Sequence, residues 1–299
     1  MGLDLSAVPD EVVQRYGLDR LPLARDEAAA AALLRLDGKR ALVTGGGGDG
    51  LGAAICTRLA EQGANVAVLD ISAEAADVTV ASIRDRWSVR AEPVLADVGD
   101  EAQVRAAADA LAERWGGIDI LVNNAGGSGS VGAGGGRVTQ HGPFKDMAYD
   151  DMHTVVRVNL VGTLLVTRAV LPHMISAGAG RIVNISSEGG KTAVTNLTAY
   201  NACKAGVIGF TRSLAAETGP HGVTVVGVCP GIMVSDRTVR ALSDPESRSF
   251  AALDDAFARV SLGRATVVDE VAAVVAFLAS EAGSFIHGTS LSLGGGMAD

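Results

Sequence analysis

The chain has 299 residues, of which 48% are hydrophobic and 20% are charged. This is an ordinary globular composition, and the length is sufficient for one large α/β domain with a fully buried sheet. The formal net charge of −9 argues against broad electrostatic attraction to nucleic acid or to an anionic membrane. We therefore expect the partners to be small molecules, with no nucleic acid.

Cysteine usage and hydropathy indicate the compartment. Cys56, Cys203 and Cys229 lie far apart and form neither a CxxC motif nor a Cys/His cluster. This pattern is typical of a reduced, cytoplasmic protein without a metal. No apolar run reaches the length of a transmembrane span, so we also expect no membrane partner.

From Arg40 onward, short apolar runs alternate with longer helical patterns. The runs predict strands at 41–44, 65–69, 92–96, 118–122, 181–185, 223–228 and 290–293, and helical patterns include 52–62, 101–115, 152–175 and 199–218. Such alternation predicts βαβ units and a parallel sheet covered by helices on both faces. The fold class is therefore α/β, with seven strands in a single doubly wound Rossmann-type domain over residues 37–299.

Three segments lie outside this alternation. Residues 1–36 form an N-terminal extension that we expect to end in an Ala-rich helix at 26–36. Residues 127–142 form a Gly-rich insertion, too flexible to hold one shape without a partner. Apolar residues at helical spacing in 235–260 fit either a substrate flap or plain packing.

A glycine-rich segment follows the first predicted strand and opens a helix. Glycines there allow a tight turn and let the backbone approach a pyrophosphate at the helix N-terminus. A flexible surface turn is the alternative, but the strand–loop–helix context favours a dinucleotide site. No Gly-Lys-Ser/Thr follows, which excludes a P-loop kinase. The candidate cofactor-binding residues are Gly45, Gly46, Asp49, Gly50, Leu51 and Gly52.

The second predicted strand leads into Asp70, 18 residues beyond Gly52. A carboxylate at this place can accept both ribose hydroxyl protons of an adenosine. A helix cap or a solvated strand end is the alternative interpretation of Asp70.

Further motifs follow in order along the chain. They are Asp97-Val98 after the third strand, Asn123-Asn124-Ala125-Gly126 after the fourth, then Asn159, Ser187, Tyr200-Asn201-Ala202-Cys203-Lys204 and Pro230-Gly231. Tyr-x-x-x-Lys alone is a weak signal, but the ordered combination is specific. Over residues 37–296 the chain resembles the short-chain dehydrogenase/reductase family, which implies a parallel sheet with strand order 3-2-1-4-5-6-7.

The chemistry of this family requires these residue types. A free phenol has a pKa of about 10, too high for an efficient base at neutral pH. Lys204 lies one helical turn from Tyr200 and places an ammonium beside the phenolate, which favours its ionised form. Tyr200 is therefore the predicted acid/base in hydride transfer between an alcohol carbon and a nicotinamide.

The resemblance assigns the remaining catalytic roles. It implies that Ser187 holds the substrate oxygen, with Ser186 the less favoured neighbour by spacing. Asn159 anchors a water that relays protons to Lys204, and Lys204 also binds the nicotinamide ribose.

The resemblance also extends the cofactor site beyond the glycine loop, Tyr200 and Lys204. It implies that Asn124 supports the sheet end near the adenosine ribose, and that Met233 and Ser235 contact the carboxamide. Asp97 and Val98 complete the predicted cofactor site.

Three departures from the family pattern stand out. The glycine loop is one residue longer than usual, which leaves the roles of residues 46–49 open. The loop after Gly126 is longer by about ten residues. Glu188 and Lys191 place charge near the substrate mouth, unless both point to solvent.

These observations predict an NAD-dependent oxidoreductase that interconverts a secondary alcohol, cyclic ones included, and its ketone. NAD is favoured because Asp70 and Asp49 would repel the 2′-phosphate of NADP, unless Arg40 or Arg90 turns inward. A biosynthetic ketoreductase is the nearest alternative, and a non-catalytic dinucleotide-binding regulator is an alternative of a different class. The resemblance implies a homotetramer, or a dimer.

Overall fold

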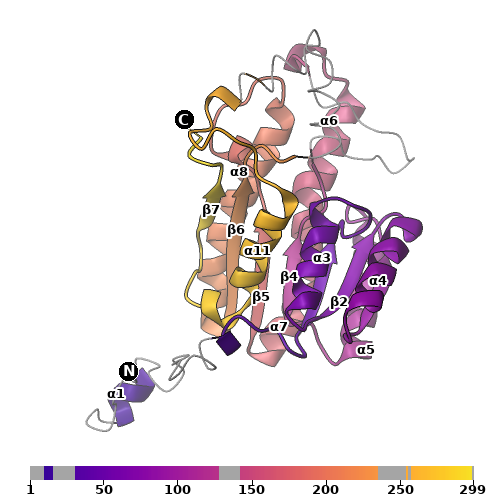
Figure 1. The fold of residues 1–299 in the computed structure, drawn as a ribbon, viewed down its shortest axis with the longest axis vertical. Helices are drawn as coiled ribbons and strands as arrows, with labels where there is room; N and C mark the ends of the chain where they lie inside the picture. The colour runs from indigo at the N-terminus through magenta and orange to yellow at the C-terminus, as the bar shows by residue number, and fades with distance from the viewer. Residues whose placement is uncertain (1–9, 16–30, 128–141, 235–253, 255–256, 298–299) are drawn as a thin grey trace.

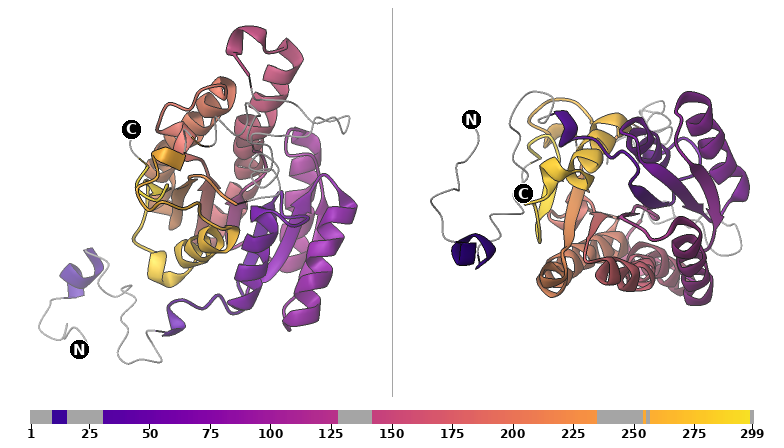
Figure 2. Two further views of the ribbon diagram at one scale, coloured as in Figure 1. Left: turned by 45° about the horizontal axis from the view of Figure 1, so that its top comes forward. Right: turned by 90° about the horizontal axis from the view of Figure 1, so that it is seen from below.

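The computed structural model describes residues 10–15, 31–127, 142–234, 254 and 257–297 (Figure 1). Seven strands form one sheet in the order β3-β2-β1-β4-β5-β6-β7, and every neighbouring pair is parallel. Helices cover both faces of the sheet (Figures 1 and 2). The predicted Rossmann-type fold and its strand order are confirmed.

The strands lie where the apolar runs predicted them, with small shifts at their ends. They are β1 (Arg40–Thr44), β2 (Asn65–Asp70), β3 (Ala91–Leu95), β4 (Ile120–Asn123), β5 (Gly180–Ile185), β6 (Val223–Pro230) and β7 (Ser290–Leu293). The largest differences are β4, which begins two residues later than predicted, and β6, which continues two residues further. The extension of β6 pairs Cys229 and Pro230 with Ser292 and Leu293.

The α-helices of the described chain alternate with these strands. They are α1 (Asp10–Arg15), α3 (Leu51–Glu61), α4 (Ala73–Arg86), α5 (Glu101–Trp115), α6 (Tyr149–Val156), α7 (Gly162–Ala177), α8 (Thr198–Thr218) and α11 (Val268–Ala279). A π-helical turn, η3 (Arg157–Val161), joins α6 to α7. Short 3₁₀ turns include η2 (Phe144–Asp146), η4 (Glu188–Gly190), η5 (Gly219–His221) and η6 (Glu281–Gly283).

Successive strand residues supply two separate cores. In β1, Val43 packs with α3, α4 and α11 on one face, whereas Leu42 packs with α5, α7 and α8 on the other. Side chains of a strand alternate between faces, so a sheet covered on both sides requires an uninterrupted apolar run. This requirement is the reason that short apolar runs predicted the strands well.

A buried chain of amides and hydroxyls ties the central strands to their helices. Asn123 donates through Nδ2 to Thr167 on α7 and to Asn184 on β5, each at 2.8 Å. Asn184 in turn donates to Thr211 on α8 at 3.0 Å. Because a buried polar group is costly unless it is hydrogen-bonded, this network fixes α7 and α8 under the carboxyl ends of β4 and β5.

The sequence predicted no segment of transmembrane length, but the continuous helix Tyr149–Ala177 reaches that length. Its 29 residues are long and apolar enough to cross a membrane by length and composition alone. Val166, Val170 and Met174 of this helix are fully buried in the core shared with α5 and the sheet. Core helices of globular domains are often equally long and apolar, so this helix is weak evidence for a membrane span.

The N-terminal extension is described only in part. Of the predicted Ala-rich helix, residues 26–30 lie outside the described residues, and the helical conformation ends at Ala32 instead of reaching Leu36. Leu36 is buried and donates its N–H to Gln62. The insertion at 127–142 is described only at its two end residues, and the flap at 235–260 only at 254 and 257–260.

Candidate active site

The glycine loop joins β1 to α3 and lies against the junction of β2 and α4. Gly46 donates its N–H to Leu69 at 3.2 Å, and Gly48 donates to Ala75 at 3.0 Å. Between them, Gly47 donates to the Asp70 carboxylate at 3.0 Å. The sequence left the roles of residues 46–49 open. Three of these residues have a structural role, because Gly46, Gly47 and Gly48 each anchor the loop to β2 or to α4.

Several glycines of the loop, among them Gly45 and Gly52, have no room for a side chain. A Cβ at Gly52 would overlap the carbonyl oxygen of Gly45 and would lie 2.6 Å from Nδ2 of Asn124. A Cβ at Gly45 would lie 2.8 Å from the Ala125 backbone, and Gly45 has a φ of +60°. Gly50 is different, because no atom lies within 4 Å of the place where its Cβ would be.

The start of α3 fits a phosphate group. The helix begins after Gly50 without a side-chain cap and without an acidic residue in its first turn. The first N–H groups of a helix have no partner inside it, and they attract anions. Glycine backbone and uncapped amides are the donor set that a dinucleotide pyrophosphate requires, so the residues present fit such a cofactor.

Asp70 ends β2 beside this loop and is half-buried. Its Oδ2 accepts from Gly47 and its Oδ1 accepts from Ser72, each at 3.0 Å. Each carboxylate oxygen has two lone pairs, so Asp70 keeps acceptor capacity for ribose hydroxyls. Asp49 is exposed on the same loop.

Arg40 and Arg90, which could have compensated the charge of Asp70, lie at the opposite ends of the strands. Arg40 begins β1 and pairs with Asp119 at 2.7 Å. Arg90 precedes β3 and pairs with Glu92 at 2.9 Å. Both are at the amino ends of parallel strands, whereas Asp70 lies at a carboxyl end.

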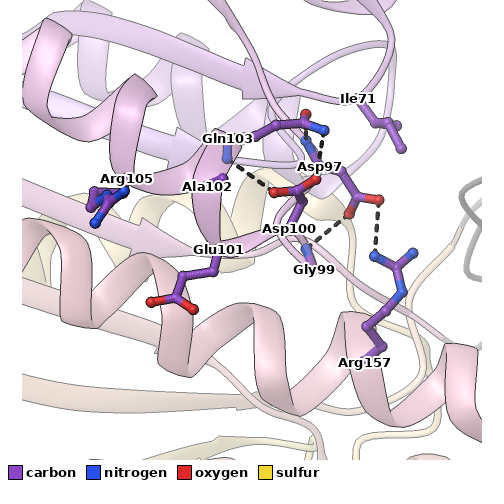
Figure 3. Close-up of a pocket in the computed structure, with 9 residues that line it drawn as sticks. All are labelled: Ile71, Asp97, Gly99, Asp100, Glu101, Ala102, Gln103, Arg105 and Arg157. Carbon is purple, nitrogen blue, oxygen red and sulfur yellow. Dashed lines mark hydrogen bonds and ion pairs between the residues drawn. The ribbon is translucent and has the colours of Figure 1, made fainter.

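Asp97 follows β3 and borders an open cavity of about 720 Å³ (Figure 3). Its carboxylate pairs with Arg157 at 2.9 Å and accepts from the Gly99 amide at 2.8 Å. A Cβ at Gly99 would overlap the Arg157 guanidinium. Sequence reasoning missed Arg157, because nothing in the chain order indicates that η3 lies against this segment. The adjacent Val98 is buried and limits the space at Gly162.

Lys204 occupies the centre of the candidate catalytic group. It is buried, and its Nζ donates to the carbonyl oxygen of Ile185 at 2.8 Å. Burial lowers the pKa of this ammonium to about 8. The ammonium lies 5.6 Å from the centre of the Tyr200 ring, so the structure brings together the pair that the motif predicted.

Ser186 and Ser187 follow β5 and are used differently. The Ser186 hydroxyl is buried and donates to the Lys204 carbonyl at 2.7 Å. The Ser187 hydroxyl accepts from Gly189 at 3.1 Å and remains able to donate. This difference favours Ser187 over Ser186 as the group that meets substrate.

Asn159 lies within the π-helical turn and is fully buried. Its amide donates to Val155 at 3.1 Å and accepts from Gly127 at 2.8 Å. A Cβ at Gly126 would lie 2.5 Å from the Asn159 side-chain oxygen. Asn159 is therefore fixed between its helix and the segment that follows β4.

Asn124 joins the ends of β1 and β4. Its side chain donates to Thr44 at 3.1 Å and to Gly45 at 3.0 Å. Asn124 therefore ties the carboxyl end of β4 to the start of the glycine loop.

The remaining predicted residues divide into three groups. Leu51 packs against the core, and Met233 packs there too and forms a single β-bridge with Thr266. Ser235 lies outside the described residues. Lys191 is exposed, but Glu188 is buried, so the alternative that both residues point to solvent is wrong for Glu188.

The comparisons agree with this geometry. A family model described as short chain dehydrogenase matches residues 39–246. The chain belongs to this family. It is 38% identical over 263 residues to D-threitol dehydrogenase of Mycolicibacterium smegmatis, a match that covers 88% of this chain and 94% of the relative.

Two solved structures of the family extend the comparison. An NAD⁺-bound xylitol dehydrogenase has a TM-score of 0.78 and 32% identity, over 87% of this chain and 99% of that one. A gluconate 5-dehydrogenase of Burkholderia cenocepacia, in complex with NADP and tartrate, has a TM-score of 0.79 and 36% identity, over 90% and 98%. The chain is thus an oxidoreductase of alcohols and ketones that uses a nicotinamide dinucleotide.

Glycine substitutions separate steric from cofactor effects in the loop. Gly52→Ala should lower Tm by several degrees and abolish measurable NADH binding, because its methyl group overlaps Gly45 and displaces Asn124. Gly50→Ala should leave Tm unchanged, since its Cβ meets open space. If the pyrophosphate lies over Gly50, Gly50→Ala should nevertheless weaken NADH binding, as measured by fluorescence titration. Equal Tm for the two variants contradicts the close packing.

Proposed function

We propose that this protein is an NAD-dependent dehydrogenase of a secondary alcohol, cyclic ones included, with Tyr200 as acid/base. The single observation that carries the proposal is the buried Lys204 ammonium placed 5.6 Å from the Tyr200 ring. A cation beside a phenol stabilises the phenolate and thereby lowers the phenol pKa toward the working pH.

Each residue has a distinct task in this proposal. When bound, the nicotinamide supplies the hydride acceptor or donor. Ser187 donates a hydrogen bond to the reacting oxygen and orients it, while Tyr200 takes the hydroxyl proton in oxidation and returns it in reduction. Lys204 holds the nicotinamide ribose as well as the charge beside Tyr200.

Proton exchange with solvent completes the catalytic cycle. Lys204 is buried, so a proton that leaves Tyr200 requires a path outward. Asn159 is fixed in the π-helical turn, and its amide orients a water that connects Lys204 with solvent. This assignment extends the role that the resemblance implies.

The cofactor residues follow the edge formed by the carboxyl ends of the strands. We assign the pyrophosphate to the glycine loop and Leu51, the adenosine to Asp70, Asp97, Val98 and Asn124, and the carboxamide to Met233 and Ser235. Asp49 adds a weaker, solvent-screened negative charge near the adenosine.

Electrostatics supports NAD over NADP. Two unit charges about 4 Å apart repel by about 4 kcal/mol at an effective dielectric constant of 20, or roughly a thousandfold in affinity. Asp70 would face the 2′-phosphate of NADP, and Arg40 and Arg90 are engaged at the far edge of the sheet. Residues 45–52 and 70–76 contain no Lys or Arg.

Two other functions use the same residues. A biosynthetic ketoreductase would run the reaction in reverse at one and the same site. A non-catalytic dinucleotide-binding regulator would need the cofactor groups but not Ser187, Tyr200 and Lys204 together. The complete catalytic set therefore favours an enzyme.

Assembly as a homotetramer is part of the proposal. Val161, Leu164 and Ile175 on the π-turn and α7 are apolar and more than one-third exposed. Apolar side chains gathered on one helix favour a subunit interface. We also propose that residues 1–36 form an extension apart from the catalytic domain at 37–299, and that the protein is cytoplasmic.

Replacement of Tyr200 tests the chemistry. Tyr200→Phe keeps the ring but removes the acid/base oxygen, so kcat on a substrate alcohol should fall roughly 10²–10⁴-fold while NADH binding is retained. Tyr149→Phe is the control, because Tyr149 is two-thirds exposed. A near-normal kcat for Tyr200→Phe eliminates this residue as the base.

Asp70→Ala tests the cofactor preference. The wild-type protein should have a higher kcat/KM with NAD than with NADP, and the variant should lose most of that ratio. Loss of hydrogen bonds weakens NAD use, and loss of repulsion improves NADP use. Asp77→Ala removes an exposed carboxylate of α4 as the control. Equal or better use of NADP by the wild-type protein refutes the assignment.

Light scattering tests the assembly. The expected mass is four times that of the 30.3 kDa chain, with a dimer as the smaller alternative. Leu164→Glu on α7 should shift the protein to smaller species, because a charge in an apolar interface is costly. Val78→Glu, on the exposed face of α4, should not. A monodisperse wild-type monomer contradicts the proposed assembly.

A further inference from the structure

A second cavity borders the turn that follows Ser187, at the carboxyl edge of the sheet. Its volume is about 330 Å³, and its walls come from two segments. Glu188 and Lys191 belong to the turn after Ser187, and the glycines 294–296 and Met297 follow β7. Ligands of open α/β sheets bind outside the carboxyl ends of the strands, which is where this cavity lies.

Glu188 is the unusual feature of this cavity. The side chain is 95% buried, with 5% of its surface exposed, and its Oε1 has no hydrogen-bond partner among the described residues. Burial of a carboxylate is costly unless donors satisfy it. The two oxygens exchange places by rotation about the last side-chain bond, which is a soft torsion.

Lys191, the cation nearest to Glu188 in the sequence, does not neutralise this carboxylate. Lys191 lies three residues along the chain, but its ammonium donates to Ser290 at 2.7 Å and to Ser292 at 2.8 Å on β7. No ion pair joins Lys191 to Glu188 in the described part of the chain. Lys191 therefore closes one side of the cavity, and Oε1 of Glu188 has no donor among the described residues.

Glycines make the opposite wall. A Cβ at Gly294 would lie 2.9 Å from Cγ of Glu188 and 3.0 Å from its Cδ. Gly294 in turn packs against Gly231, where a Cβ would lie 2.9 Å from the Gly294 backbone. Gly231 follows Pro230 at the end of β6, so the cavity borders the segment proposed to hold the nicotinamide carboxamide.

Ser187 and Glu188 are adjacent in the chain but differ in backbone conformation. Ser187 is extended, with φ −166° and ψ 154°, whereas Glu188 begins the 3₁₀ turn η4, so their side chains leave the backbone in different directions. They are suited to two different oxygens of one substrate, with the second several bonds from the reacting carbon.

We propose that Glu188 is a specificity-determining residue that accepts a hydrogen bond from a distal hydroxyl group of a polyol substrate. This inference rests on the proposed function and narrows its substrate class to alcohols with several hydroxyls. A hydroxyl in the cavity can donate to this carboxylate in place of water, whereas a hydrocarbon at the same place removes water and leaves the carboxylate unsatisfied. The site therefore selects polyols partly by penalising apolar alcohols.

Paired substrates test the selection. The kcat/KM of wild type, Glu188→Gln and Glu188→Leu is measured with D-threitol or xylitol and with 2-butanol, which has one hydroxyl. Loss of a hydrogen bond to a charged group should lower the polyol to 2-butanol ratio roughly 10–100-fold in Glu188→Leu, with a smaller fall in Glu188→Gln. Glu217→Gln, on the exposed face of α8, should keep the wild-type ratio. Equal ratios in all four proteins overturn the inference.

Binding without turnover separates this inference from the proposed function. In the presence of NADH, D-threitol should raise the Tm of wild type more than that of Glu188→Leu. An equal shift overturns the inference even if the protein oxidises alcohols. Failure of the wild type to reduce NAD with any alcohol, combined with a Glu188-dependent Tm shift, instead counts against the proposed activity and supports the polyol site.

The stability of the unliganded protein gives an independent readout. Glu188→Gln keeps the shape but removes the unpaired charge, so its Tm should rise. Glu217→Gln should leave Tm unchanged. A fall in Tm for Glu188→Gln shows that groups of the protein already satisfy the carboxylate, and it overturns the inference.

Discussion

The site depends on one junction, where the strand order reverses between β1 and β4. Thr44 ends β1, and its hydroxyl accepts from the amides of Asn124 and Ala125, each at 3.0 Å. Asn124 returns two hydrogen bonds to the end of β1. This reciprocal clamp closes only because Gly45 and Gly52 allow the backbones to approach. The glycine loop, the start of α3 and the segment that leads to Gly127 all take their positions from it.

The sequence predicted the features that local residue patterns determine. Strands buried on both faces must be apolar throughout, so their positions and order followed from the runs and from the resemblance. The π-helical turn at Arg157–Val161 could not be predicted, because an Asn in an α-helix and one in a π-turn leave the same pattern. The sequence left the burial of Glu188 open for a related reason. Charged residues are rarely buried, and only the packing of the chain after β7 makes this one an exception.

The Asp97–Arg157 pair shows what distant contacts add. Arg157 opens the π-turn that also contains Asn159, and it reaches Asp97 past Gly99, where a Cβ would overlap its guanidinium. The segment that follows β3 and the turn that carries a candidate catalytic amide are therefore fixed to each other. The proposed cofactor contact at Asp97 and the orientation of Asn159 share one rigid support. Neither motif alone indicates this connection, since Asp97 and Arg157 are 60 positions apart in the chain.

Burial of Lys204 has opposing consequences for stability and for catalysis. Because burial lowers the ammonium pKa to about 8, the unfolded chain binds more protons than the native protein between pH 8 and the ordinary lysine value of 10.5. The stability contribution of Lys204 therefore rises with pH across that interval and is at its lowest below pH 8. The same burial leaves the charge poorly screened, so it acts strongly on Tyr200. A negative phenolate beside Lys204 would in turn favour the charged lysine, which makes the two ionisations mutually supportive. The cost in stability and the proposed acid/base chemistry thus have one physical origin.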